Sequence, residues 1–176
     1  MKIRFILLTF LVLNIFPALA QEEAEVPEQE YKYQLVLVLG YTHIPEARTE
    51  GETTESENLP TIGLDFFYRI HEKWKLGIVL DLELNKYEVD FEGDRLRRET
   101  AFITGIVAGF EILPRWGIIF GPGLEFERNK NLFLLRLGME YAFELGRSWE
   151  ILPAINFDFK KEFNTYSLGL GIGKRF

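Results

Sequence analysis

Residues 74–84 have the sequence WKLGIVLDLEL, in which large apolar side chains alternate with small or charged ones. Every even position from Trp74 to Leu84 is apolar, whereas the odd positions hold Lys75, Gly77, Val79, Asp81 and Glu83. A period of two residues is typical of a β-strand, whose successive side chains point to opposite faces. The stretch therefore predicts a strand with one continuous apolar face.

The same alternation occurs in seven further segments, close to residues 31–42, 62–70, 102–112, 116–126, 133–143, 149–159 and 166–176. Tight turns are predicted at 71–73, 113–115 and 146–148. The opposite ends are joined by long charged loops at 44–59 and 85–99, and by short links near Asn129 and Asn164. Short turns at one end and longer loops at the other are typical of outer-membrane barrels. We therefore predict an all-β fold, an eight-stranded antiparallel up-and-down transmembrane β-barrel with both termini in the periplasm.

Three observations indicate which face of the barrel points outward. About 45 large apolar side chains cannot fit inside eight strands, whose interior is just wide enough to be filled by side chains. The apolar face carries no charge except Lys174, as expected where a midplane Lys or Arg costs about 2–4 kcal/mol. The other face combines many glycines with charges of both signs, which predicts a narrow polar lumen. The predicted lumen charges are Asp65, Arg69, Lys75, Asp81, Glu83, Glu111, Glu125, Arg136, Glu140, Asp158 and Arg175.

Aromatic residues lie near the ends of the predicted strands, as in the interface girdles of membrane barrels. We expect Trp74, Trp116 and Trp149 to face the periplasmic interface with Tyr33, Tyr68 and Tyr141, and Tyr41 and Tyr166 to face the outer one. Two prolines, Pro122 and Pro153, lie within predicted strands and fit the barrel less well. A closed barrel has no edge strand that could hold a residue without an N–H donor. A local β-bulge is predicted there, particularly around Pro122.

The first 20 residues have the layout of a secretory signal peptide. A positive start and an apolar run are followed by Ala18 and Ala20 at the −3 and −1 positions of a cleavage site. Residues 21–30 are acidic and predict a flexible segment, so the barrel would span residues 31–176. The net charge of −7 argues against nucleic acid as a partner. The chain has no cysteine, which excludes disulfides and thiolate metal sites.

The chain resembles the small outer-membrane barrel proteins of the OmpA and OmpX type over residues 31–176. The resemblance rests on the strand pattern and on the C-terminal stretch YSLGLGIGKRF, residues 166–176. In that family an alternating last strand ending in Phe is the signal for the barrel-assembly machinery, and Leu168, Leu170, Ile172 and Phe176 match it. Lys174 departs from the pattern, because an apolar or aromatic residue is usual there. The resemblance implies location in the outer membrane, with membrane lipids and the assembly machinery as partners.

The sequence offers little that would support catalysis. His43 and His71 are predicted at opposite ends of the barrel, Ser167 has no nearby histidine, and the His-x-Ser pair expected of a lipid deacylase is absent. We therefore expect no enzyme activity, cofactor or metal, and predict a structural or adhesion-like interaction barrel with a filled lumen. A narrow cation-preferring channel and, less favoured, a lipid-modifying enzyme remain alternatives. The acidic loop 44–59 is a candidate contact for an extracellular partner, although a solvated loop explains its composition more simply.

Overall fold

The computed structural model describes residues 31–45, 47–48, 56–91, 94–146 and 148–176. The predicted signal peptide and the acidic segment 21–30 lie outside the described residues. Among the described residues, no helix is long and apolar enough to cross a membrane. The strands are β1 (Tyr33–Ile44), β2 (Ala47–Arg48), β3 (Glu57–His71), β4 (Trp74–Phe91), β5 (Asp94–Leu113), β6 (Trp116–Phe126), β7 (Leu132–Tyr141), β8 (Phe143–Glu144), β9 (Trp149–Lys160) and β10 (Thr165–Arg175).

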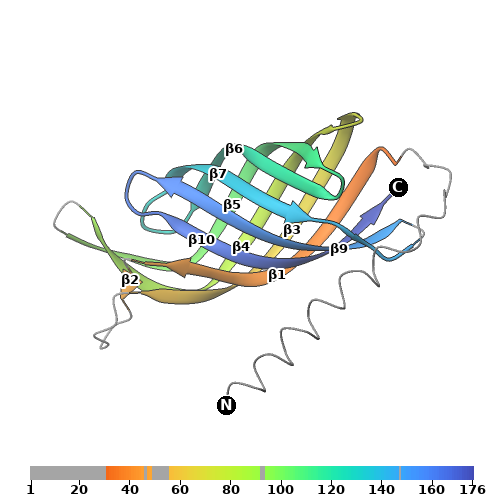
Figure 1. The fold of residues 1–176 in the computed structure, drawn as a ribbon. Coiled ribbons are helices and arrows are strands. Elements are labelled where there is room, and N and C mark those ends of the chain that lie inside the picture. Colours follow the sequence, from red (N-terminus) through yellow and green to blue (C-terminus); the bar gives the residue numbers. More distant parts are fainter. Residues whose placement is uncertain (1–30, 46, 49–55, 92–93, 147) are drawn as a thin grey trace, which may run out of the picture. The chain divides into compact units, whose positions relative to one another are not determined.

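The eight long strands form one closed antiparallel sheet, with each strand paired to its neighbours in the sequence (Figure 1). Closure comes from β1 and β10, which pair in register from Gln34 opposite Arg175 to His43 opposite Tyr166. At the end of this seam, Tyr33 and Phe176 exchange two backbone N–H···O bonds of 2.9 Å each. The closed eight-stranded antiparallel barrel predicted from the alternation is thereby confirmed.

The interior glycines allow neighbouring strands to approach closely. A methyl group on Gly121 would lie 2.1 Å from the carbonyl oxygen of Ile106, and one on Gly40 would lie 2.3 Å from that of Leu168. In both cases the obstacle is backbone, which cannot move aside as a flexible side chain can. Glycine is therefore required at these two positions by the packing of one strand against the next.

The two strand prolines are accommodated without the predicted bulge, which was wrong. Strands β5 and β6 keep one register on both sides of Pro122, from Gly105 opposite Gly123 to Ala108 opposite Phe120, although the ladder is interrupted between them. Opposite Pro153 the ladder between β9 and its neighbour also lapses, so that one strand is divided into β7 and β8 with the same register in each. A missing donor thus removes local hydrogen bonds without shifting the strands.

The segment 85–99, predicted as a loop, is instead the outer part of a long β-hairpin formed by β4 and β5 (Figure 1). The register shifts between Glu83 and Lys86, opposite Thr100, which has a positive φ of 50°. Beyond this bulge the pairing continues from Lys86 opposite Glu99 to the last pair, Phe91 opposite Asp94. The short strand β2 pairs with the outer part of β4, so part of the predicted loop 44–59 is also strand.

A small apolar core lies at the end of the barrel from which the hairpin of β4 and β5 extends; we call this the outer end, and the end with the tight turns the inner end. This core is formed by buried side chains from the ends of several strands and from the link between β9 and β10: Ile44, Ala47, Leu59, Tyr87, Val89, Leu132 and Phe163. The rings of Tyr87 and Phe163 meet edge to face at 6.3 Å, and burial raises the pKa of Tyr87. We call these seven residues the outer core. They anchor the base of the outer hairpin to the neighbouring strand ends by apolar burial.

Candidate functional site: a filled lumen between two charged ends

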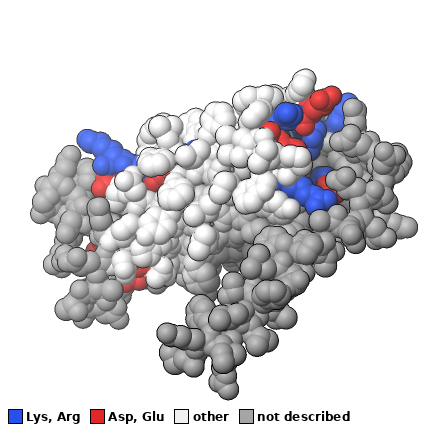
Figure 2. Space-filling view, in the orientation of Figure 1, with Lys and Arg blue, Asp and Glu red and all other residues white. Residues whose placement is uncertain are grey.

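A belt of apolar side chains surrounds the barrel wall. Figure 2 shows this belt as an uncoloured surface between two ends where charged residues gather. Its side chains are exposed although they are large and apolar; Ile106, for example, is 68% exposed and Leu168 is 65% exposed. A continuous exposed apolar surface of this kind is costly in water and is expected where lipid covers it.

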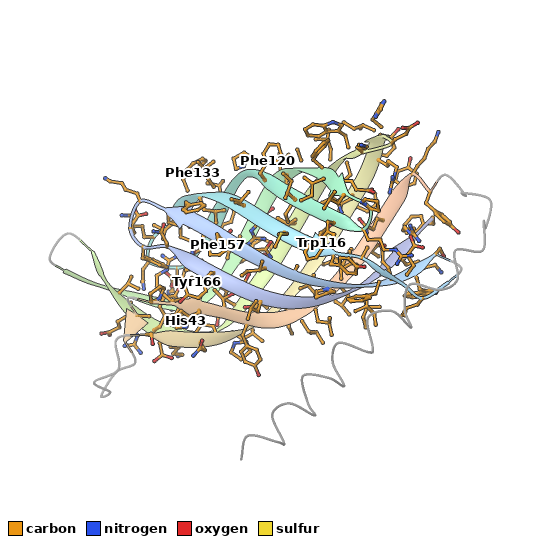
Figure 3. The ribbon with its side chains drawn as sticks, viewed as in Figure 1. His43, Trp116, Phe120, Phe133, Phe157 and Tyr166 are labelled. Atoms are coloured by element: carbon orange, nitrogen blue, oxygen red, sulfur yellow. The ribbon has the colours of Figure 1, made fainter. Side chains whose placement is uncertain are left out.

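Aromatic residues predicted to face the membrane interfaces lie on the outer surface in contact with one another. Trp116 packs against Tyr141 with ring centroids 4.9 Å apart, and Tyr33 contacts Tyr68 at 5.4 Å. At the outer end Tyr166 contacts the ring of His43 at 4.7 Å (Figure 3). The ammonium group of Lys174 lies 5.1 Å from the ring of Trp149, a cation–π contact that gives this cation a partner near the C-terminus. The role of these aromatic residues at the lipid interface remains a prediction.

The centre of the lumen is occupied by one arginine between two aspartates. The Arg136 side chain donates two hydrogen bonds of 2.7 Å to the carboxylate of Asp158 and one of 2.5 Å to Asp81. Arg136 and Asp158 are almost completely buried. A planar guanidinium that bonds two carboxylates on different strands closes the space between β4, β7 and β9.

A second ion cluster lies farther out, just beneath the outer core. The buried Arg98 bonds to Glu125 and donates a 2.5 Å hydrogen bond to the carbonyl oxygen of Lys130. The other carboxylate oxygen of Glu125 lies 2.5 Å from the ammonium group of Lys160. The side chains of Arg98, Glu125 and Lys160 are fully buried at this level, and Glu83 is buried close by. We call Arg98, Glu125 and Lys160 the outer ion cluster.

The inner end of the lumen is also bridged by polar contacts. The ammonium group of Lys75 lies 2.5 Å from Glu140 and donates to Gln34 at 3.1 Å, and Gln34 in turn bonds to Glu150. Arg175 pairs with Glu144 at 3.2 Å. A cavity of about 20 Å³ lies here, lined in part by Lys75 and Arg175, which is room for about one water molecule.

The structure thus brings together Lys75 with Glu140 and Asp81 with Arg136 and Asp158, all of them predicted lumen charges. Glu83 and Glu125 lie in the outer part of the lumen, and Asp65 has a buried carboxylate oxygen without a hydrogen-bond partner among the described residues. Arg69 is exposed at the inner turn and donates to the carbonyl of Glu72. Glu111 is half-buried at the inner end of β5, where its backbone N–H donates a 2.9 Å hydrogen bond to the carbonyl oxygen of Lys73, and in the described part of the chain its side chain does not join these groups.

The predicted lumen charges omitted Arg98, Glu150 and Lys160, which are buried inside the barrel. Glu150 and Lys160 share the strand face of Asp158, so the alternation of β9 could have found them. Arg98 could not be found in this way, because the bulge at Thr100 changes the face on which the residues before it lie.

The two histidines lie at opposite ends of the barrel. His43 Nδ1 is 2.8 Å from the side-chain oxygen of Asn58 near the outer end, whereas His71 pairs with Trp74 at an inner turn. Among the described residues no group of three or more His, Cys, Asp or Glu side chains is arranged to hold a metal ion.

No family model matches the sequence, and no curated protein matches it either. Solved structures, however, share its fold. The outer membrane protein OprG of Pseudomonas aeruginosa matches with a TM-score of 0.59 and 10% identity, covering 83% of this chain and 96% of that one. The N-terminal β-barrel domain of OprF from the same organism has a TM-score of 0.57, 10% identity and coverages of 84% and 100%.

A third match is the attachment invasion locus protein Ail of Yersinia pestis, in complex with the heparin analogue sucrose octasulfate. Its TM-score is 0.52, its identity 15%, and the match covers 82% of this chain and 99% of that one. The structural neighbours are bacterial outer-membrane proteins. The closed eight-stranded sheet, its exposed apolar belt and these matches together identify the fold of this chain as that of the small outer-membrane β-barrels.

Proposed function

We propose that the protein is a non-catalytic, non-conducting barrel of the outer membrane, which acts through the surface that its outer end presents. The observation that carries this proposal is the filled lumen. Three successive levels of paired polar side chains, capped by the outer core, occupy the path that an ion would have to follow. Opening that path would require separating buried ion pairs, at several kcal/mol for each charge left without a partner.

The outer end supports the second half of the proposal. The hairpin of β4 and β5 continues beyond the barrel, and its base is held by the outer core instead of lying loose over the mouth. A surface that is ordered before it meets a partner loses less conformational entropy on binding. Ail, a protein of the same fold, was solved with a heparin analogue. An interaction role for the outer hairpin is in keeping with that precedent.

Planar-bilayer recordings test the filled lumen. The purified barrel is expected to give no stable, salt-dependent conductance steps, because each level of the lumen is bridged by paired side chains. Reproducible steps whose size rises with salt concentration would contradict the proposal and support the narrow channel. Because acidic residues outnumber basic ones among the predicted lumen charges, such a channel would be expected to prefer cations.

Cysteine labelling tests the orientation. The chain has no cysteine, so a single introduced thiol is labelled without background. The variant Arg128→Cys, in the exposed link between β6 and β7, is expected to react with a membrane-impermeant maleimide on intact cells. The variant Lys73→Cys, in an exposed turn at the other end, is expected to react only after the outer membrane is permeabilised. The reverse result would place the hairpin in the periplasm and refute the proposed outward presentation.

A further inference from the structure

The acidic and basic side chains in the outer half of the lumen do not balance. Among the described residues, two ion-paired levels lie there: the level around Arg136 and, beyond it, the outer ion cluster. Five carboxylates with little or no exposure to solvent belong to these levels, against three cations. The carboxylates are those of Asp81, Glu83, Glu125, Glu127 and Asp158, and the cations are Arg98, Arg136 and Lys160. If all of these groups were ionised, two negative charges would have no counterion.

Glu83 is the carboxylate that has no cation of its own. The other four carboxylates each contact at least one of the three cations, at 3.4 Å or less. Glu83 is 1% exposed, and it forms no ion pair within the part of the chain that the structure describes. Its Oε2 atom is buried without a hydrogen-bond partner among the described residues. The unbalanced charge of the outer lumen can therefore be assigned to one side chain.

The groups around Glu83 do not supply the missing counterion. The charges that act on it most strongly are those of Lys160, Glu125, Asp158 and Asp81. Lys160 is the one cation among them, and its ammonium group lies 2.5 Å from Glu125. The remaining polar groups that face this level are bonded to other partners: Arg98 of β5, Arg136 of β7, and the hydroxyl groups of Thr42 and Thr61 on β1 and β3. A carboxylate in such surroundings takes up a proton, because burial and neighbouring negative charges both disfavour its ionised form.

Glu83 also lies at the joint between the barrel wall and the outer hairpin. It is the last residue of β4 that keeps the register of the wall, opposite Thr61 on β3 and Ala101 on β5. The bulge between Glu83 and Lys86 follows directly, and Tyr87 of the outer core comes next. The Tyr87 hydroxyl is buried without a partner among the described residues, within reach of the charge of Glu83. A charge that forms on Glu83 therefore acts on the base of the hairpin.

We propose that Glu83 is a proton-binding site, which is protonated while the outer hairpin is held in place and whose ionisation loosens the base of the hairpin. The ionised side chain repels Glu125 and competes with it for Lys160, so the contacts that hold the buried Arg98 are weakened. Water must also enter to solvate the new charge. The proton thus regulates the surface to which the proposed function assigns the interaction, and in this respect the inference rests on that function.

The first test measures how the stability of the barrel depends on pH. Glu83→Gln imitates the neutral carboxyl group, and urea unfolding in lipid vesicles compares it with the wild-type chain. The unfolded chain ionises this glutamate above about pH 4.3, whereas the folded barrel keeps the proton. From about pH 5 the unfolding equilibrium constant of the wild type, relative to that of the variant, is therefore expected to rise about tenfold per pH unit until Glu83 ionises in the folded barrel too. A ratio that is constant or falls with pH would overturn the proposal.

Glu125→Gln is the matched control, because it is the same substitution at a second fully buried glutamate of the same level. Glu125 is bonded to Arg98 and Lys160, so its loss leaves two buried cations without their partner. At about pH 7 this control is expected to raise the unfolding equilibrium constant by more than about a hundredfold, whereas Glu83→Gln is expected to leave it unchanged or lower it. A Glu83→Gln barrel that is damaged as much as the control, or that does not fold, would show that Glu83 is ionised and paired.

Two further measurements separate the proton from its effect on the hairpin. The infrared spectrum of the wild type minus that of Glu83→Gln is expected to contain one band of a protonated carboxyl group at neutral pH, and its absence would refute the proton-binding site. At the higher pH at which this band disappears, backbone amides of residues 86–89 are expected to exchange with deuterium about tenfold faster in the wild type than in the variant. Equal exchange there, or a band that persists at about pH 10, would refute the regulation. The proposed function is judged separately, by conductance and cysteine labelling.

Discussion

Replacing Arg136 by alanine is expected to destabilise the barrel by about 3–5 kcal/mol, because it leaves the carboxylates of Asp81 and Asp158 in the lumen without their common partner. The measurement is urea unfolding of the barrel reconstituted in lipid vesicles, followed by the fluorescence of its three tryptophans. Arg69→Ala is the matched control. Arg69 is exposed and donates one hydrogen bond to the carbonyl of Glu72, so its loss is expected to cost less than about 1 kcal/mol.

A rescue variant separates charge from packing in this experiment. Arg136→Met combined with Asp81→Asn and Asp158→Asn removes all three charges and retains most of the side-chain volume. It is expected to recover most of the lost stability, because an uncharged group of similar shape leaves no ion without a partner. If Arg136→Ala is no more costly than Arg69→Ala, the lumen is hydrated and the filled interior on which the proposed function depends is refuted.

The second large effect is expected from Ile106→Arg, in the middle of the apolar belt. A water-soluble barrel would tolerate this substitution, because Ile106 is 68% exposed and surface changes in soluble proteins are usually within about 0.5 kcal/mol. In a bilayer, arginine at the midplane of a barrel costs about 2–4 kcal/mol. Refolding into vesicles and urea unfolding measure the difference directly.

Leu145→Arg is the control for the position within the membrane. Leu145 is 60% exposed, similar to Ile106, but it lies in the turn between β8 and β9, outside the belt. The cost there is expected to be about 0–1 kcal/mol. Equal costs at the two positions would contradict the assignment of the belt to the lipid core. A small cost at both would point to a soluble barrel.

The strands of the barrel wall could be predicted because lipid imposes one constraint on every outward position. Every even position of residues 74–84 is apolar, and the structure has all of these positions, from Trp74 to Leu84, exposed or half-buried on the outer surface. The seam between β1 and β10 followed from the even number of such segments. A pattern that extends over the whole wall is difficult to mistake for a local preference.

The outer end could not be predicted in the same way, because no lipid constrains it. Charged residues between 85 and 99 suit a solvated loop as well as a solvated hairpin. The alternation of Tyr87, Val89 and Phe91 was the available signal, and it was masked by the charges between them. Arg98 was hidden for a further reason: the bulge at Thr100 changes the alternation, so a residue on the apparent outer face lies fully buried against Glu125.

The two strand prolines show why a rule for a single residue did not predict the structure of the closed sheet. A bulge was expected because a closed barrel has no edge strand on which a residue without an N–H donor could be placed. In the closed sheet each strand is held by two neighbours, so Pro122 and Pro153 interrupt a few hydrogen bonds while the rest of the ladder keeps its register. A bulge would disturb many pairs of residues on neighbouring strands at once, whereas an interrupted ladder loses only the hydrogen bonds next to the proline.

The seam also determines the order of events during folding. It joins Gln34 to Arg175, residues near the two ends of the described chain, whereas every other pair of neighbouring long strands is close in sequence. Hairpins such as β6 with β7 can form locally, but the seam must wait for the most distant contact, and contacts of this range slow folding. Until then β1 and β10 each carry a row of unsatisfied backbone groups, which can pair with another chain. The last step of assembly is therefore the one at which this protein is most exposed to aggregation.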